Sequence, residues 1–270
     1  MRPWLIFVLV LWPWAALAEV PVLTGNLVQG GLVQGQVTPG TRVEFDGRAV
    51  RVDGNGSFII GFGRDFPDAA PLYWYGLDGR RQAKALTIKA RRYKVQRIDG
   101  LPAKMVTPPR EVLARIRHEN GVIGAVRAKN SPTPWHASGF RWPLQGRISG
   151  VYGSQRVLNG KPRRPHYGLD IAAKPGSPVH ASTDGMVALA ERDLYYTGGT
   201  VMLDHGHGLT SVYSHLQSVT VAAGQLVRQG EQIGTLGATG RATGPHLDWR
   251  LNWVKQRLDP ALLVGPMPQP

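Results

Sequence analysis

The stretch His246-Leu-Asp-Trp-Arg-Leu251 alternates polar and apolar side chains. Alternate side chains of a β-strand point to the same face of the sheet. His246 and Asp248 are therefore expected on one face, while Leu247 and Trp249 pack against the other. The pattern predicts a strand that aims two polar groups at one spot.

Further β-like runs, separated by glycines, fill the sequence from Phe140 up to this strand, and no long amphipathic helix interrupts them. The clearest runs are Gly185-Met-Val-Ala188, Thr200-Val-Met-Leu203, Leu209-Thr-Ser-Val-Tyr213 and Gln232-Ile-Gly234. We therefore expect a C-terminal domain over residues 139–260 that is mainly antiparallel β-sheet, followed by a loose tail at 261–270.

The segment from residue 19 to 92 carries a second set of short β-rich runs. These are Thr41-Arg-Val-Glu-Phe45, Ala49-Val-Arg-Val52 and Ser57-Phe-Ile-Ile60. They are separated by Asp46-Gly47 and Asp53-Gly-Asn-Gly56, which favour hairpin turns because these residues tolerate positive φ. The segment predicts a small antiparallel β-sandwich without catalytic residues, serving as a binding or spacer module.

Residues 93–138 are expected to form a linker that contains a short helix. The helix is predicted from Arg110 to about Arg127, after Pro108-Pro109, and Gly121 weakens it or splits it in two. Its apolar stripe consists of Val112, Ile116, Ile123 and Val126. The basic side chains beside the stripe are interpreted as a solvated face, with contact to a membrane or polymer as the alternative.

The first 18 residues have the pattern of a secretory signal peptide. An apolar run from Leu5 to Leu11 follows Arg2, and Ala16-Leu-Ala18 precedes Glu19. The run is too short to span a bilayer, so we expect cleavage and no transmembrane anchor afterwards. Export points to the periplasm or the outer surface, and the lack of wall-anchoring repeats or a sorting tail favours the periplasm.

The chain is strongly basic and contains no cysteine. Removing residues 1–18 deletes Arg2 and no acidic residue, so the formal charge falls only from +14 to +13. Such a charge attracts anionic partners, which outside the cytoplasm are wall polymers or lipid head groups rather than nucleic acid. A role of the charge in solubility alone is equally compatible with the sequence. Without cysteine, disulfides are excluded and any metal must bind oxygen and nitrogen ligands.

Three separated residues are candidates for a zinc site. Imidazole and carboxylate groups bind zinc, and a catalytic site needs three protein ligands and one open position. His166, Asp170 and Asp248 are able to supply those ligands. His215 and His246 would then remain for proton transfer or for stabilising oxyanion charge. The H-x-D motif alone is weak evidence for a metal site. The metal site is favoured by the combination of this motif with His166, Asp170 and His215.

The run from Phe140 to Trp249 resembles the lysostaphin-type (LytM-like) zinc endopeptidases that cut peptidoglycan peptides. The landmarks in matching order are Phe140-Arg-Trp-Pro143, Gly146-Arg-Ile-Ser149, His166-Tyr-Gly-Leu-Asp170, Pro178-Val-His-Ala181, Asp184-Gly185, Tyr213-Ser-His-Leu216, Gly230-Glu-Gln-Ile-Gly234 and Thr239-Gly-Arg-Ala-Thr-Gly-Pro-His-Leu247. The resemblance covers the C-terminal domain and only loosely the N-terminal module.

This resemblance implies a role for each candidate residue. His166 and Asp170 match the first two zinc ligands of the family, and His215 and His246 match its two catalytic histidines that do not bind the metal. Asp248 stands where the family normally has a histidine as third ligand. One histidine with two carboxylates cancels the +2 charge of zinc, which weakens the polarisation of bound water. Arg250 and Arg163-Arg164 are nearby cations able to compensate.

The resemblance therefore implies a secreted zinc-dependent endopeptidase that hydrolyses peptide bonds of peptidoglycan stems or cross-links. The alternative is a catalytically inactive homologue that binds cell wall or regulates another wall hydrolase. The other histidines receive no catalytic role: His205 and His207 are expected to be structural or exposed, and His118, His136 and His180 are also set aside.

Overall fold

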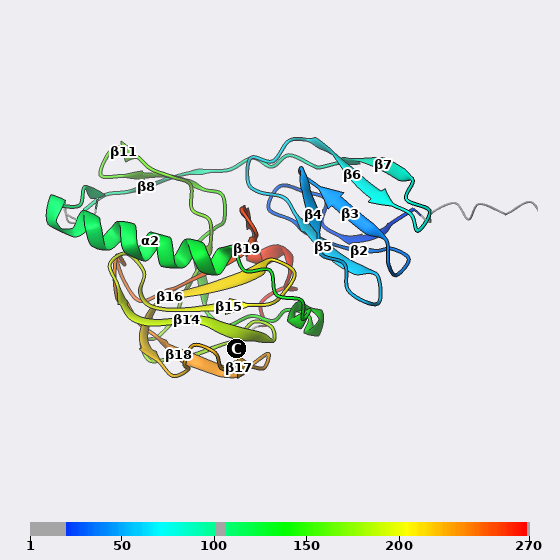
Figure 1. Cartoon of the computed structure of the whole chain (residues 1–270). Coiled ribbons are helices and arrows are strands. Elements are labelled where there is room, and N and C mark those ends of the chain that lie inside the picture. The colour runs from blue at the N-terminus through cyan, green and yellow to red at the C-terminus, as the bar shows by residue number, and fades with distance from the viewer. Residues whose placement is uncertain (1–19, 101–105, 269–270) are drawn as a thin grey trace, which may run out of the picture.

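The computed structural model describes residues 20–100 and 106–268, so the predicted signal peptide lies outside the described residues. Figure 1 shows two β-rich bodies side by side, with one long helix lying along the C-terminal body. Within the described residues, no helix is long and apolar enough to cross a membrane. The mainly β fold class predicted from the sequence is confirmed.

The N-terminal body is the predicted antiparallel β-sandwich. One sheet has the order β1-β2-β5 and the other β4-β3-β6-β7. The strands are β1 (Val22–Gly25), β2 (Leu32–Gln36), β3 (Arg42–Phe45), β4 (Arg48–Val50), β5 (Ser57–Gly61), β6 (Ala69–Tyr75) and β7 (Arg81–Thr87). Val43 pairs with Trp74 and Phe45 with Leu72 across the sheet, and all four side chains are buried. Alternation along the strands thus builds the core of the sandwich.

The C-terminal body is built on one large antiparallel sheet. Its main path runs β17-β14-β15-β16-β19-β12-β9, with β13 and β20 at its margins and β18 joining β13 to β16. The strands are β9 (Arg147–Gly150), β12 (Leu169–Ala172), β13 (Pro178–His180), β14 (Gly185–Leu194), β15 (Gly198–Asp204), β16 (Leu209–Val219), β17 (Leu226–Val227), β18 (Gln232–Leu236), β19 (Leu247–Trp253) and β20 (Gln256–Leu258).

Strand β19 lies between β12 and β16, and its register positions the polar residues of the sequence motif. Asp248 is directly opposite Asp170 on β12 and Ser214 on β16. Leu247 and Trp249 are fully buried, as the alternation in the sequence predicts. The sheet register therefore brings two aspartates that are far apart in sequence onto one face.

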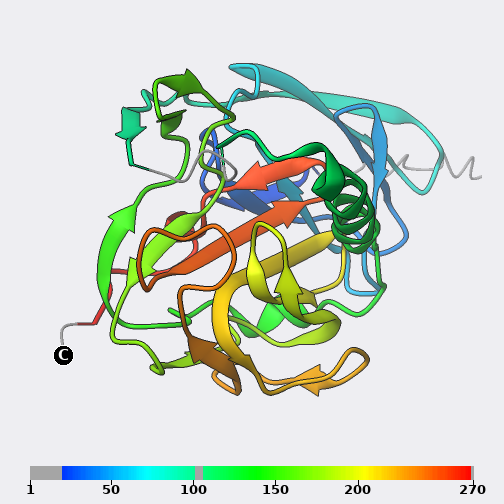
Figure 2. The same ribbon diagram turned by 90° about the vertical axis from the view of Figure 1, so that its left-hand side faces the viewer.

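The linker contributes a strand and a helix to the C-terminal body. Strand β8 (Val95–Ile98) pairs in parallel with β10 (Gln155–Leu158), and β10 also pairs with β11 (Lys161–Pro162). A 3-10 helix (Arg110–Val112) leads into the uninterrupted helix α2 (Leu113–Arg127), so Gly121 does not split it. A second 3-10 helix spans Trp135–Ser138. Figure 2 shows α2 end-on beside the large sheet.

Helix α2 is attached to the sheet through one end of its apolar stripe. Val126 is buried against Leu189, Leu194, Met202 and Val212, and Val122 and Ile123 pack beside it. Arg115 forms salt bridges with Glu119 and with Asp193 on β14. These contacts hold the helix against the face of the sheet that β14, β15 and β16 form.

The two bodies share one hydrophobic core. The rings of Phe45 and Trp253 lie 6.3 Å apart between centroids, and a side chain at Gly61 would clash with Leu258. Arg91 and Asp259 add a salt bridge of 2.7 Å. The apolar contacts and the salt bridge together hold the N-terminal module against β19, β20 and the residues that follow them.

The C-terminal tail differs from the sequence prediction. A 3-10 helix (Pro260–Leu262) is capped by the Asp259 side chain, which accepts a hydrogen bond from the Ala261 N–H. Farther along, the Trp142 Nε1–H donates to the Gly265 carbonyl at 3.0 Å, and Met267 packs against the core. The prediction of a loose tail is therefore wrong up to residue 268, because apolar side chains anchor this stretch.

Candidate metal centre

His166 and Asp170 form the first half of the predicted site. His166 precedes β12, and its backbone N–H donates to the Ser154 carbonyl at 2.8 Å, which fixes its position. The Nε2 atom of His166 lies 3.0 Å from Oδ1 of Asp170, and both residues are buried. Apart from this contact with each other, both ring nitrogens of His166 and Oδ1 of Asp170 have no hydrogen-bond partner. Buried polar atoms are rarely left unsatisfied, so these atoms are suited to a bound ion.

Asp248 completes the group on the neighbouring strand. Ligand atoms of His166, Asp170 and Asp248 all lie within 4.8 Å of one another. Two atoms that each bind a tetrahedral zinc ion at about 2 Å are about 3.3 Å apart, so a modest adjustment suffices for all three to bind one ion. The structure thus brings together the three residues that the sequence predicts as metal ligands. No other such group of three occurs among the described residues.

Each aspartate also has an arginine partner. The Arg156 guanidinium donates to Oδ2 of Asp170 at 2.8 Å. Arg250 donates through Nε to Oδ1 of Asp248 at 2.8 Å and through Nη2 to its Oδ2. Like charges directly opposite each other in a sheet repel, and the two arginines offset that repulsion. The sequence indicated Arg250, whereas Arg156 carries no spacing signal because it comes from β10.

Neighbouring side chains keep both carboxylates ionised in the buried site. Burial alone would raise the pKa of Asp248, but the charge and hydrogen bonds of Arg250 hold it well below its usual range. Burial also acts to raise the pKa of Asp170, whereas His166 and Arg156 lower it further than burial raises it. Both residues are therefore anionic at neutral pH, the state in which a carboxylate binds a metal.

Two glycines make room for the carboxylates. A Cβ atom at Gly150 would lie 2.2 Å from Oδ2 of Asp170, and one at Gly168 would lie 2.3 Å from Oδ1 of Asp248. Such distances are far inside van der Waals contact. The sequence around the site thus uses glycine where the backbone approaches each aspartate.

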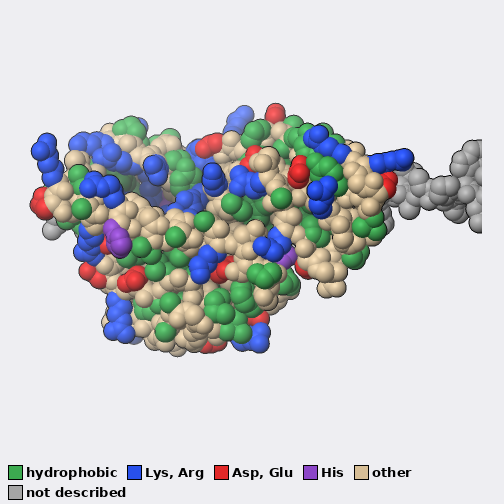
Figure 3. Space-filling model, in the orientation of Figure 1, with side chains coloured by type: hydrophobic (Ala, Val, Ile, Leu, Met, Phe, Trp, Pro, Cys, Tyr) green, Lys and Arg blue, Asp and Glu red, His purple; other side chains and the backbone are tan. Residues whose placement is uncertain are grey.

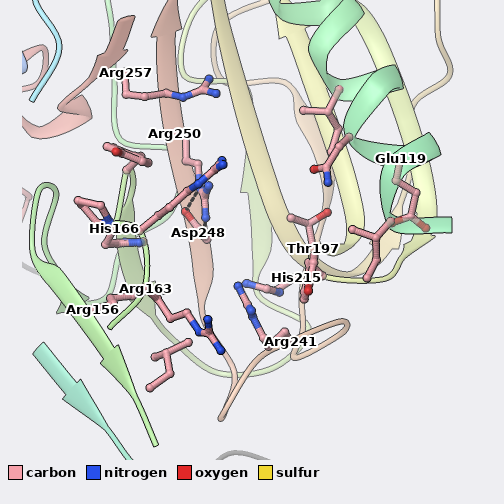
Figure 4. Close-up of a pocket in the computed structure, with 18 of the residues that line it drawn as sticks. Glu119, Arg156, Arg163, His166, Thr197, His215, Arg241, Asp248, Arg250 and Arg257 are labelled. Atoms are coloured by element: carbon pink, nitrogen blue, oxygen red, sulfur yellow. Dashed lines mark hydrogen bonds and ion pairs between the residues drawn. The ribbon is translucent and has the colours of Figure 1, made fainter. Parts of the chain in front are cut away.

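The two predicted catalytic histidines lie beside this group, His215 within β16 and His246 directly before β19. The rings of His215 and His246 are 4.8 Å apart between centroids, and Nε2 of His246 lies 4.0 Å from Oδ1 of Asp170. His215 has a φ of 67°, a sparsely populated conformation for a residue other than glycine. In Figure 4, Asp248 lies between His166 on one side and His215 on the other.

The hydrogen bonds of both histidines define their neutral tautomers. Nδ1 of His215 lies 2.8 Å from the Thr239 carbonyl, and Nδ1 of His246 lies 2.9 Å from the Gly244 carbonyl. A carbonyl can only accept, so each Nδ1 carries the hydrogen and each Nε2 keeps a lone pair. Burial lowers the pKa of His215 to about 4, so this ring is neutral at pH 7.

The site opens into a cleft of about 760 Å³. Helix α2 forms one wall through Ile116, Glu119 and Ile123, and the β10–β11 region forms the opposite wall. Figure 3 shows a hollow above α2 with Lys and Arg side chains gathered around it. Besides Arg156 and Arg250, five arginines line the cleft, and we call them the arginine rim: Arg127, Arg163, Arg164, Arg241 and Arg257. Of these, only Arg163 and Arg164 were indicated by the sequence.

The remaining histidines of the sheet lie apart from this site. His205 is fully buried, with Nδ1 2.7 Å from the Asp184 carbonyl and Nε2 2.7 Å from the Ser211 hydroxyl. His207 and His136 pack ring to ring at 5.2 Å. His118 and His180 line neither the metal group nor the cleft. Of the two roles expected for His205 and His207, the structural one fits, because both are buried.

Comparison with known proteins agrees with this geometry. Residues 164–260 match Peptidase family M23. A crystal structure of a Pseudomonas aeruginosa protein assigned to peptidase M23 superposes with a TM-score of 0.69 at 28% identity, covering 88% of this chain and 95% of that one.

Two curated relatives match the C-terminal part of the chain. The cell division protein DipM of Caulobacter vibrioides is 38% identical over 127 residues, which are 47% of this chain and 20% of DipM. The peptidoglycan DD-endopeptidase ShyA of Vibrio cholerae is 40% identical over 114 residues, which are 41% of this chain and 26% of ShyA. The chain thus spans about a fifth to a quarter of the length of these relatives. Its C-terminal domain belongs to peptidase family M23, the lysostaphin-type (LytM-like) peptidases.

Proposed function

We propose that this chain is an exported, zinc-dependent endopeptidase that hydrolyses peptide bonds in peptidoglycan stems or cross-links. One observation carries the proposal: buried ligand atoms of His166 and Asp170 that make no hydrogen bond lie together beside Asp248, and His166 and Asp248 line an open cleft. A domain that only bound wall polymer would have no need for such atoms, because unsatisfied buried polar groups destabilise the fold.

The residues present fit a zinc ion. His166, Asp170 and Asp248 would hold it, and both carboxylates are already ionised. When bound, zinc supplies a Lewis acid that polarises the scissile carbonyl and acidifies water. Arg250 and Arg156 fix the orientation of the two aspartates through hydrogen bonds, a role that partners of metal ligands commonly have.

His215 and His246 provide the proton transfers. Each presents an Nε2 lone pair because its Nδ1–H donates to a backbone carbonyl. One ring accepts a proton from the attacking water. That ring then passes the proton to the leaving nitrogen as the peptide bond breaks. The other ring takes up a proton from solvent and, through Nε2–H, donates a hydrogen bond to the oxygen on which negative charge develops. The 4.8 Å separation of the ring centroids supports a role for both rings at the same reacting group.

The substrate and the location are part of the proposal. Relatives named as peptidoglycan endopeptidases support a wall peptide as substrate, and the basic cleft suits an anionic polymer. The pattern of the first 18 residues supports export, and the periplasm is the proposed compartment. Another wall hydrolase would be a binding partner only under the alternative function, in which the chain is an inactive homologue that regulates such an enzyme.

Incubation of the mature, zinc-loaded chain with purified sacculi tests the proposal. The expected result is release of soluble muropeptides with newly exposed peptide termini, detected by liquid chromatography and mass spectrometry. Chelation should abolish release and zinc should restore it, while His166→Ala should stay inactive. If the folded, zinc-supplemented chain releases nothing yet binds sacculi, the endopeptidase proposal fails and the binding or regulatory alternative takes its place.

A further inference from the structure

The arginine rim carries positive charge that the acids around the cleft do not balance. Of the acids lining the cleft, Glu119 is engaged by Arg115 at 2.6 Å and Asp248 by Arg250. Within the described parts of the chain, the rim arginines other than Arg241 make no salt bridge with a carboxylate. Arg241 lies over the ring of Tyr196, 4.3 Å from its centroid. The cleft therefore has a surplus of cations close to the metal group.

The rim arginines destabilise one another in their charged form. Burial, and then the neighbouring Arg257 and Arg250, lower the pKa of Arg127 to about 9. Burial and Arg250 likewise lower the pKa of Arg257 to about 10. The Nε atom of Arg127 is buried and has no hydrogen-bond partner. Such an arrangement is unfavourable in the free protein and becomes favourable when an anion binds between the walls.

We infer that the arginine rim binds ionised carboxylates of the substrate on both sides of the scissile bond, so that the preferred substrate is an acidic peptide rather than a neutral one. The inference rests on the proposed endopeptidase function and specifies its substrate. Guanidinium groups pair with carboxylates through two parallel hydrogen bonds. Arg163, Arg241 and Arg257 reach the cavity from different sides (Figure 4), so separate carboxylates are bound at separate places.

The shape of the cleft agrees with an extended ligand. A second hollow of about 500 Å³ shares Arg164, Tyr167 and Arg257 with the main cleft. It continues to Arg64 and Phe66 of the N-terminal module. Because the shared apolar core holds the module in place, the two hollows stay next to each other. Two adjoining hollows suit a peptide that is attached to a polymer.

The test compares two cross-linked muropeptides that differ only in charge, one with free carboxylates and one with the same carboxylates amidated. The zinc-loaded enzyme is assayed for KM and kcat on each. Binding of the same pair is measured by calorimetry on zinc-loaded His215→Ala protein, which is designed to hold substrate without rapid hydrolysis. The double variant Arg127→Gln/Arg164→Gln probes the rim. Arg117→Gln is the matched control, because Arg117 is exposed on the same helix and does not line the cleft.

The inference predicts a KM at least about tenfold lower for the free carboxylates than for the amides, and a matching difference in Kd. The rim variant should lose most of this difference, whereas Arg117→Gln should keep it. Equal KM and Kd for both peptides, or an equal loss in Arg117→Gln, would overturn the inference. Carboxylate-dependent binding without hydrolysis of either peptide would support the rim and reject the endopeptidase function, so the two failures are distinguishable.

Discussion

Two groups of buried histidines in the same sheet have opposite relations to their surroundings. Neither ring nitrogen of His166 makes a hydrogen bond, although Nε2 lies 3.0 Å from Oδ1 of Asp170. Both ring nitrogens of His205 are hydrogen bonded, one to the Asp184 carbonyl and the other to the Ser211 hydroxyl. Burial is nearly the same, since His166 is 2% exposed and His205 0%. Burial of a histidine thus does not distinguish a ligand from a structural residue. The two kinds of histidine are distinguished by whether their ring nitrogens make hydrogen bonds.

The largest contrast is expected from removing one histidine of each group. His166→Ala should eliminate bound zinc and reduce muropeptide release to background, because a ligand is lost. His205→Ala should keep the zinc but lower the free energy of unfolding by about 2–4 kcal/mol, because it leaves buried partners unsatisfied and a void. Metal analysis and urea unfolding of both variants check this. A zinc loss in folded His205→Ala as large as in His166→Ala would remove the contrast.

His215 separates metal binding from proton transfer within the first group. His215→Ala should lower kcat by about 10²–10⁴-fold, the usual contribution of a general acid or base, while zinc content stays unchanged. Steady-state kinetics and metal analysis on the same preparation measure both. A kcat within about threefold of the wild type would exclude His215 from the chemistry.

The pair of Asp248 and Arg250 offers a smaller, energetic test. Asp248→Ala leaves the Arg250 guanidinium without its partner, so the metal-free protein should lose about 3 kcal/mol of stability. This is the lower end for a buried pair, because 26% of the Arg250 side chain is exposed. The double variant Asp248→Ala/Arg250→Ala should recover part of the loss. Additive losses in the double variant would mean that the two residues are not coupled.

The smallest effect, counted per unit of pH, concerns the structural histidines. Burial lowers the pKa of His136 and His205 from 6.5 to about 4. Between these values the unfolded chain binds more protons than the folded one, so stability falls as the pH drops from about 6.5 to 4. Each histidine contributes at most about 1.4 kcal/mol per pH unit. Unfolding of wild type and His205→Gln across this range measures it, and an unchanged slope in the variant would contradict the assignment.

Much of the fold was predictable because the strands have strong local patterns. Thr41-Arg-Val-Glu-Phe45 became β3, and the alternation after His246 became β19. The parallel pairing of β8 with β10 was not predictable, since nothing local specifies a partner strand. The shared core around Trp253 depends on the same kind of distant contact.

The candidate site was predictable in its ligands and not in its surroundings. The family resemblance pointed to His166, Asp170 and Asp248, which the sheet register brings together. Arg156 and most of the arginine rim come from separate segments whose meeting depends on tertiary structure, so no motif marks them. The composition of the sequence showed only that the protein carries a net positive charge. The structure shows where that charge is concentrated.

The most direct measurement is the zinc content of the purified mature chain beside that of Asp248→Ala, with muropeptide release assayed on the same folded samples. The account predicts one zinc ion per chain together with release in the wild type, and loss of both in the variant. A wild type that binds no zinc, or an Asp248→Ala protein that keeps its zinc and its activity, would contradict a metal centre built from His166, Asp170 and Asp248.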